Sequence, residues 1–199
     1  MLQSNNTATN SHLIWQWTLA TALAGAIVGA LEAGGWQFFA TLILSGVAVG
    51  IAQYFIVRRY VSKASWWVVA STFGWIGGVF LQTGLSGLVF PVVTALTRLG
   101  GWEVLWLNVL DQPITTLVLG LAQWFVLRRS LMHSQHWIWG SAIAGVFLGA
   151  VGATVCYVGC EPIANAAGGI VTGAIVNGSA WAIYGLVTGW LLQHLMRKD

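Results

Sequence analysis

Five long stretches without a single Asp, Glu, Lys or Arg constrain the fold of this chain more than any other feature. They cover residues 13–31, 36–57, 64–97, 130–160 and 162–196. An apolar helix of about twenty residues is long enough to span the hydrocarbon core of a bilayer. Only 7% of the residues are charged, against roughly a quarter in a soluble domain. The sequence therefore predicts an all-α integral membrane protein.

The apolar stretches divide into six predicted transmembrane helices, at residues 13–33, 36–58, 65–86, 112–129, 137–158 and 168–196. Residues 1–12 are a predicted disordered cytoplasmic tail, and residues 13–199 a single transmembrane domain. The fourth helix has two candidate starts. Asp111-Gln112-Pro113 is typical of a helix start, with a carboxylate near the cap and proline in the first turn. The alternative start near Trp102 would bury Asp111, which costs more.

The charged residues predict how the chain is oriented. Seven of the eight basic residues are Arg58, Arg59, Lys63, Arg128, Arg129, Arg197 and Lys198, whereas Glu32, Glu103, Asp111 and Glu161 lie in the alternate connections. Basic residues beside short loops mark the cytoplasmic side, so both termini are predicted to be cytoplasmic. The pairs Arg58-Arg59, Arg128-Arg129 and Arg197-Lys198 are predicted to bind anionic lipid or an acidic partner, or else to form a pore mouth.

An internal repeat gives the predicted architecture. GIAQYFIVRRY at residues 50–60 returns as GLAQWFVLRRS at residues 120–130, and each basic pair follows a glycine by eight residues, at Gly50, Gly120 and Gly189. Trp17, Trp66 and Trp137 likewise precede Gly25, Gly74 and Gly145 by eight residues. The prediction is three tandem two-helix hairpins, at about 13–59, 65–129 and 137–198, with pseudo-threefold symmetry about the membrane normal.

Glycines four residues apart indicate close helix packing. They include Gly25/Gly29, Gly46/Gly50, Gly74/Gly78, Gly145/Gly149, Gly169/Gly173 and Gly185/Gly189. Small residues at this spacing let transmembrane helices approach closely. Contacts inside the bundle are the favoured interpretation, and docking onto another membrane protein or self-association is the alternative.

Tryptophans are unusually frequent, and most are predicted to lie near the membrane surfaces. Trp15, Trp17, Trp66, Trp67, Trp137 and Trp139 are expected at the cytoplasmic ends of helices and Trp36, Trp102 and Trp106 at the outer ends. This distribution is typical of an aromatic belt. The Trp-rich segment VVTALTRLGGWEVLWL, residues 92–107, predicts a helix lying in the interface.

Four residues are candidates for cofactor binding: Gln53, Gln123, Asn177 and His194. A buried amide needs a partner, so the glutamines either join neighbouring helices or hold a ligand. Asn177 shares one face of the last helix with Trp181, Tyr184 and Thr188, which is typical of a packed interface or a polar cavity. Chlorophyll or carotenoid is the candidate ligand, with the deeper Trp75 and Trp181 as stacking surfaces.

The remaining polar residues predict neither a metal site nor catalysis. The histidines share no helical spacing with a carboxylate, and no nucleophile is accompanied by a base and an orienting group. Cys156 and Cys160 lie at the outer end of the fifth predicted helix and are candidates for a disulfide in an oxidising compartment. Helical spacing of four is at the edge of disulfide geometry, so a turn at Gly159 and Pro162 would be needed.

The G-x-A-Q-[YW]-F-x-x-R-R helix ends, followed by SWWVVASTFGW at residues 65–75, resemble a group of uncharacterised multi-pass membrane proteins of cyanobacteria and other bacteria. The resemblance covers predicted helices two to five and implies no activity. It implies a plasma or thylakoid membrane, with photosynthetic complexes as partners.

Two functions are consistent with these patterns. The first is a non-catalytic membrane subunit or assembly factor that docks on a larger complex and binds lipid or pigment. The alternative is a small channel or transporter with a cytoplasmic basic ring. Channels and transporters usually carry charged residues or broken helices at mid-membrane, and the absence of such residues from the predicted spans favours the first.

Overall fold

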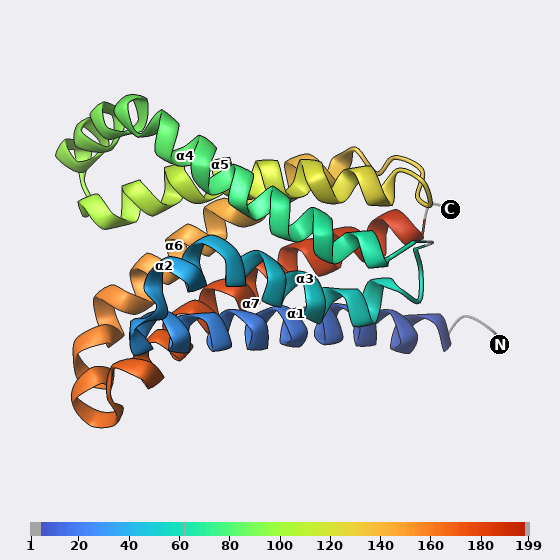
Figure 1. The fold of residues 1–199 in the computed structure, drawn as a ribbon, viewed down its shortest axis with the longest axis horizontal. Helices are drawn as coiled ribbons and strands as arrows, with labels where there is room; N and C mark the ends of the chain where they lie inside the picture. The colour runs from blue at the N-terminus through green and yellow to red at the C-terminus, as the bar shows by residue number, and fades with distance from the viewer. Residues whose placement is uncertain (1–4, 62, 198–199) are drawn as a thin grey trace.

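The fold is built from helices that run side by side in an elongated bundle (Figure 1). The computed structural model describes residues 5–61 and 63–197, and these ranges contain no strand. The long helices are α1 (Asn5–Leu31), α3 (Ser45–Val57), α4 (Ser65–Leu99), α5 (Glu103–Leu127), α6 (His136–Ala167) and α7 (Gly169–Met196). Three short segments, η1 (Glu32–Trp36), α2 (Gln37–Phe39) and η2 (Ala40–Leu44), connect α1 to α3.

Five stretches of the described chain are long and apolar enough to cross a membrane: His12–Val57, Ser65–Leu99, Glu103–Leu127, His136–Ala167 and Gly169–Met196. The first has 46 residues and includes η1, where Gly35 has a φ of 97°. Glycine adopts this conformation without the steric cost that a Cβ imposes. α3 packs against α1 and leads back toward the end of the bundle where α1 begins (Figure 1).

Two helix starts differ from those predicted from sequence. α1 begins at Asn5, so residues 5–12 are helical where a disordered tail was expected. α5 begins at Glu103, so the predicted start at Asp111-Gln112-Pro113 is wrong. Asp111 lies inside α5, where one carboxylate oxygen accepts a 2.9 Å hydrogen bond from Gln82 Nε2 on α4. This bond offsets part of the cost of placing a carboxylate there.

The predicted interfacial helix over residues 92–107 is also wrong. α4 continues to Leu99 with Pro91 inside it, and the chain then breaks at Gly100 and Gly101, whose φ values are 135° and 84°. Trp102 is extended before α5 starts. The two glycines therefore end one long helix and allow the next to begin, and the amphipathic segment is divided between α4 and α5.

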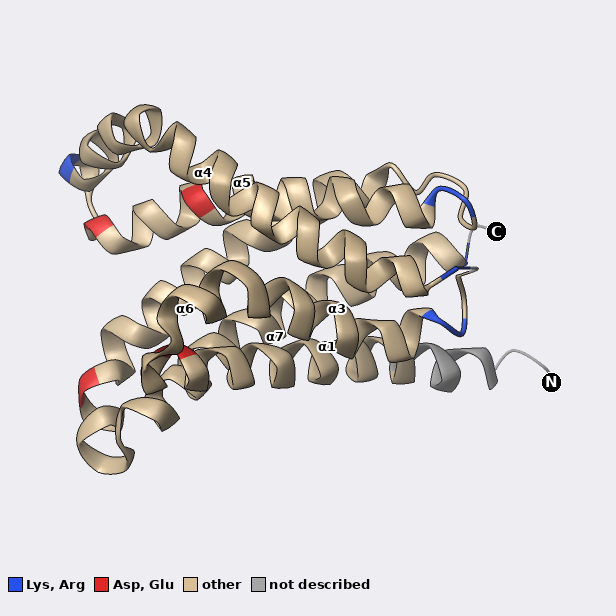
Figure 2. Ribbon diagram, viewed as in Figure 1, with Lys and Arg blue, Asp and Glu red and all other residues tan. Residues whose placement is uncertain are grey.

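Large apolar side chains cover much of the outside of the bundle. Leu19, Leu23 and Ile27 on α1 are each about 60% exposed, with values of 59%, 64% and 59%. Their spacing of four residues places them on one outward helix face. Charged residues gather instead at the ends, with most Lys and Arg at one end and the acidic residues toward the other (Figure 2). This distribution fits an integral membrane protein.

Candidate functional site

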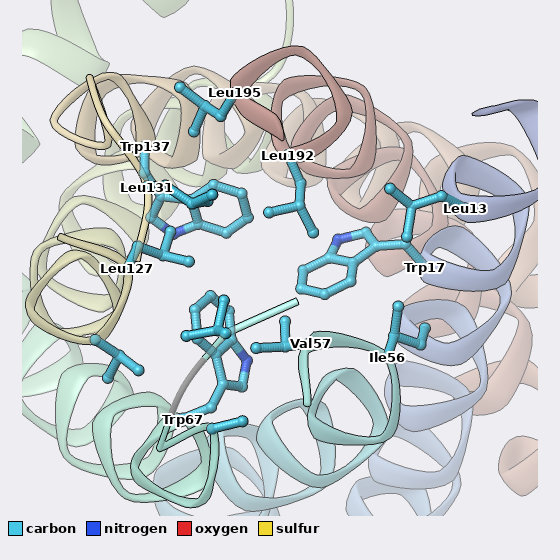
Figure 3. Packing of buried hydrophobic residues seen from close by; sticks show 13 residues of the cluster. Leu13, Trp17, Ile56, Val57, Trp67, Leu127, Leu131, Trp137, Leu192 and Leu195 are labelled. Atoms are coloured by element: carbon cyan, nitrogen blue, oxygen red, sulfur yellow. The ribbon is translucent and has the colours of Figure 1, made fainter. Parts of the chain in front are cut away.

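Three tryptophans meet inside the bundle near its basic end. The side chains of Trp17, Trp67 and Trp137 are fully buried, and their rings contact one another edge to face with centroids 6.0, 6.0 and 5.7 Å apart. Figure 3 shows the three indoles pointing inward from three sides, among leucine and valine side chains. Edge-to-face pairs add about 0.5–1.5 kcal/mol each beyond area burial, so this trio is a rigid part of the core.

The trio corrects two sequence-based interpretations. Trp17, Trp67 and Trp137 belong to the core and not to the predicted aromatic belt, whereas Trp15, Trp66 and Trp139 are 61%, 57% and 66% exposed. The predicted alignment of the repeats grouped Trp66 with Trp17 and Trp137, whereas Trp67 is the residue that packs against these two tryptophans. Spacing from a glycine could not distinguish these neighbours, of which Trp66 is exposed and Trp67 is buried.

Two glutamines bind two of these indoles at positions seventy residues apart. Trp67 Nε1 donates to Gln53 Oε1 at 3.1 Å, and Trp137 Nε1 donates to Gln123 Oε1 at 2.9 Å. Both glutamine side chains are fully buried. Each bond joins a helix to the one that precedes it in the chain, α4 to α3 and α6 to α5.

The amide nitrogens of the same glutamines bind hydroxyl groups on a third helix. Gln53 Nε2 donates to Thr21 Oγ1 at 3.2 Å, and Gln123 Nε2 donates to Ser71 Oγ at 2.9 Å. A longer contact of 3.5 Å runs from Gln123 Nε2 to Gln53 Oε1. Together with the tryptophans these residues form a polar layer, the glutamine–tryptophan network, defined as Trp17, Thr21, Gln53, Trp67, Ser71, Gln123, Trp137 and Thr188.

Trp17 completes the network through a different partner. Its Nε1 donates to Thr188 Oγ1 on α7 at 3.0 Å, and the Thr188 hydroxyl donates in turn to the carbonyl of Tyr184 at 2.7 Å. Leu192, not a glutamine, is buried one helical turn further along α7. The network therefore connects α1 to α7 without a third glutamine, although Gln193, the residue after Leu192, is also buried.

The third side of the network leaves two hydroxyl groups unpaired. Ser141 on α6 follows Trp137 by four residues, as Thr21 follows Trp17 and Ser71 follows Trp67. The Tyr184 hydroxyl lies near Ser141, but neither group meets the geometry of a hydrogen bond. An unpaired buried hydroxyl costs free energy, so this side is the least satisfied part of the layer.

A second aromatic layer lies deeper in the bundle. Trp75 and Trp181 contact each other with centroids 5.3 Å apart, and Tyr184 packs on Trp181 at 5.2 Å. All three are at most 6% exposed, and Trp75 Nε1 donates to the carbonyl of Thr41 at 2.7 Å. Trp75 and Trp181, expected as stacking surfaces for a pigment, thus pack against each other with their rings tilted by 45°.

The basic residues at the end of the bundle lie over partly exposed aromatic rings or are themselves exposed. The Arg58 guanidinium is 5.8 Å from the Tyr54 ring centroid and 5.3 Å from that of Phe55. Arg128 repeats this arrangement over Trp124 and Phe125, at 5.2 and 4.7 Å. Arg59, Arg129 and Arg197 are exposed, and Lys198 lies outside the described residues.

A carboxylate and an amide meet at the opposite end of the bundle. Glu32 accepts hydrogen bonds from Thr41 Oγ1 at 2.9 Å and from Asn177 Nδ2 at 3.2 Å. Glu32 and Asn177 line a shallow cavity of 460 Å³ together with Cys156 and Cys160, which are joined by a disulfide. The disulfide lies within α6, with a Cα–Cα distance of 4.6 Å, and α6 continues past Pro162 without the expected turn.

The last cofactor candidate, His194, is separate from these groups. It is exposed on α7 and stacks on Trp190 with an interplanar angle of 10°. The four candidates thus fall in three places: Gln53 and Gln123 in the network, Asn177 beside Glu32, and His194 on the surface. No group of three or more His, Cys, Asp or Glu side chains within residues 5–61 and 63–197 is placed to hold a metal ion.

The predicted packing glycines lie against neighbouring helices. A Cβ at Gly50 would lie 2.9 Å from Ser71 Cβ, and one at Gly120 would lie 2.6 Å from Ser141 Cβ. Close neighbours of this kind surround eleven of the twelve paired glycines that carried the prediction: Gly25, Gly29, Gly46, Gly50, Gly74, Gly78, Gly145, Gly149, Gly173, Gly185 and Gly189. By contrast, Gly169 has open space around it.

Of the hydroxyl members of the network, Thr21, Ser71 and Thr188, sequence reasoning named only Thr188, on one face of the last predicted helix. The signal that could have found two of them is a Ser or Thr four residues after each buried tryptophan. A second signal is the equal spacing of fourteen residues from Gln53 to Trp67 and from Gln123 to Trp137.

Comparison with family models, curated proteins and solved structures finds no match for the chain.

Proposed function

We propose that this protein is a non-catalytic integral membrane subunit or assembly factor that docks on a larger membrane complex and binds lipid. The observation that carries the proposal is the filled interior of the bundle. Two layers of buried aromatic side chains and a hydrogen-bonded glutamine layer occupy the space that a transport path would need. The large apolar surface faces outward, where membrane lipids and other membrane proteins can contact it.

The proposed architecture is six spans arranged as three hairpins with pseudo-threefold symmetry. Its support is the chain reversal at Gly35 within the first apolar stretch, together with the matching hydrogen bonds from Trp67 to Gln53 and from Trp137 to Gln123. The burial of the tryptophan column at Trp17, Trp67 and Trp137 adds to that support. The third hairpin differs from the first two at Leu192, where the glutamine is missing.

The proposed orientation places the basic end and both termini in the cytoplasm. Its support is the concentration of arginines at the end where α3 and α5 finish (Figure 2), together with the preference of Lys and Arg for cytoplasmic loops. The resemblance to cyanobacterial and other bacterial multi-pass proteins supports a plasma or thylakoid membrane and a photosynthetic complex as the partner. Chlorophyll or carotenoid remains the candidate ligand, and its support is the abundance of tryptophan.

A small anion channel is the second candidate, and the basic pairs favour it. Arg58 and Arg128 lie at one end of the bundle on equivalent aromatic platforms, and a ring of such charges at a pore mouth selects anions. The buried tryptophan trio beside this ring opposes the idea, because its side chains have no exposed area.

Purification from the native host in mild detergent tests the first candidate. We expect an integral membrane partner to co-purify at constant stoichiometry, identified by mass spectrometry, and an absorption spectrum will report any pigment. Replacing Arg58 and Arg128 by glutamine should reduce retention of the partner or of anionic lipid, at about 1 kcal/mol per basic residue. Purification of the unmodified protein without any partner would contradict the docking role.

Reconstituted vesicles test the channel directly. We expect no anion flux from the unmodified protein, and none from the Arg58→Gln/Arg128→Gln variant, since the interior is filled. Robust flux through the unmodified protein that changes in rate or selectivity with the two substitutions would favour the channel instead.

A further inference from the structure

An apolar groove with two cations at its mouth lies between α4 and α5. Its volume is 430 Å³, within the range of about 300–1,000 Å³ typical of small-molecule sites. Its walls are Trp66, Val69, Ala70 and Phe73 from α4 and Ala122, Phe125 and Val126 from α5, and its two charged residues are Lys63 and Arg129. No acidic residue is among those lining side chains.

The two cations stand where the helices begin and end. Lys63 lies in the connection two residues before α4, and Arg129 lies two residues after the last residue of α5. Both are exposed, at the end of the bundle where most basic residues gather (Figure 2). The groove thus runs from a positively charged mouth along exposed aromatic walls, with Phe73 70% and Trp66 57% exposed.

A second groove of the same volume provides an internal comparison. It lies between α6 and α7, also measures 430 Å³, and is lined by His133, His136, Ile143, Trp190 and His194 among others. His133 has a φ of 55° and Lys63 a φ of 59°, so the two connections share an unusual backbone conformation. The two grooves therefore share their position between paired helices, but no Lys or Arg is among the described residues that line the second.

We propose that the α4–α5 groove binds one anionic glycerophospholipid. An acyl chain lies along Val69, Ala70 and Phe73, and the phosphate is held between Lys63 Nζ and the Arg129 guanidinium. The apolar walls match a hydrocarbon chain, and the paired cations match a phosphate at the depth where headgroups begin. This proposal rests on the proposed membrane location but not on the proposed partner.

Native mass spectrometry of the purified chain tests the site. The protein is reconstituted in nanodiscs of phosphatidylglycerol or of phosphatidylcholine and then released for measurement. We expect one tightly retained phosphatidylglycerol, weaker retention of phosphatidylcholine, and no displacement by inorganic phosphate. Lys63→Gln/Arg129→Gln should lower phosphatidylglycerol retention by roughly tenfold or more, because both basic groups contact its headgroup.

Two further variants separate the groove from a general effect of charge. Val69→Trp fills the α4–α5 groove from an exposed position without changing charge, and it should also abolish tight retention. Ile143→Trp makes the matched change in the α6–α7 groove, and it should leave retention unchanged. Equal retention of the two lipids, or wild-type retention by Val69→Trp or by the Lys63/Arg129 variant, would overturn the site. Co-purification of a partner is measured separately, so either proposal can fail alone.

Discussion

Each buried glutamine in the glutamine–tryptophan network connects three helices through one side chain. The oxygen of Gln123 accepts from the Trp137 indole on α6, and its nitrogen donates to Ser71 on α4. Because Gln123 belongs to α5, a single amide orders the helices on both of its sides. Among buried side chains, such a bond matters most through the cost of leaving its partners unpaired.

Replacing Gln123 by leucine should therefore destabilise the bundle by about 1–3 kcal/mol, the cost of an unsatisfied buried donor. The measurement is equilibrium unfolding in detergent micelles. Trp137→Phe removes the indole donor. In that variant the replacement of Gln123 by leucine should have a smaller effect on stability, so a double-mutant cycle should show coupling. Strictly additive effects would mean that the 2.9 Å bond between Trp137 and Gln123 contributes nothing specific.

At the level of helices and connections, two glycines next to each other have different roles. Gly34 and Gly35 both have open space around them, but only Gly35 has a positive φ, of 97°. The reversal between α1 and α3 thus depends on backbone conformation at one residue and not on close packing. Sequence alone shows a Gly-Gly pair without saying which member turns the chain.

Gly35→Ala should consequently lower the free energy of unfolding by about 1–3 kcal/mol, the cost of a non-glycine residue in a sparsely populated backbone region. Gly34→Ala is the matched control and should change stability little. Both variants can be measured by thermal unfolding in the same detergent. Equal stability of the two alanine variants would show that the turn tolerates a Cβ at Gly35.

Close helix contacts at Gly50 and Gly120 lead to a second prediction at this scale. A Cβ at either position meets a serine of the following long helix, at 2.9 Å from Ser71 Cβ or 2.6 Å from Ser141 Cβ. Leucine at either site should thus overpack the helix contact and cost about 1–3 kcal/mol. Thermal unfolding of both variants gives the comparison, and a neutral effect at one site beside a severe effect at the other would contradict equivalent packing roles.

At the scale of the whole molecule, the apolar stretches and the charge positions predicted the fold more accurately than local sequence signals predicted the helix boundaries. The all-helical fold, the long apolar helices and the gathering of most basic residues at one end follow from uncharged runs and charge positions, because burial in hydrocarbon excludes charge almost everywhere. The start of α5 at Glu103 matches the alternative start near Trp102, which sequence reasoning disfavoured because Asp111-Gln112-Pro113 has the composition of a cap. Tertiary contact with Gln82 lets Asp111 lie inside a helix after all. Trp67 and Trp66 could not be told apart for the same reason: only packing selects the buried neighbour.

The number of spans decides where the two termini lie. α1 begins and α7 ends at the same end of the bundle (Figure 1). The proposed six crossings would place both termini on one side of the membrane, whereas five would leave them on opposite sides. Cysteines introduced at Tyr60 and Gln135, both exposed at the basic end, should be protected from an impermeant thiol reagent added outside intact cells. A cysteine at Leu99, which is 86% exposed, should react.

Epitope tags at the two termini complete this topology test. Both should become accessible to antibody only after the membrane is permeabilised, because the basic end is expected to be cytoplasmic. The native Cys156–Cys160 disulfide keeps the background low in the unmodified protein, since neither sulfur is free. Tags on opposite sides would contradict six spans, whereas external labelling at Tyr60 and Gln135 with both tags outside would reverse the orientation and keep the fold.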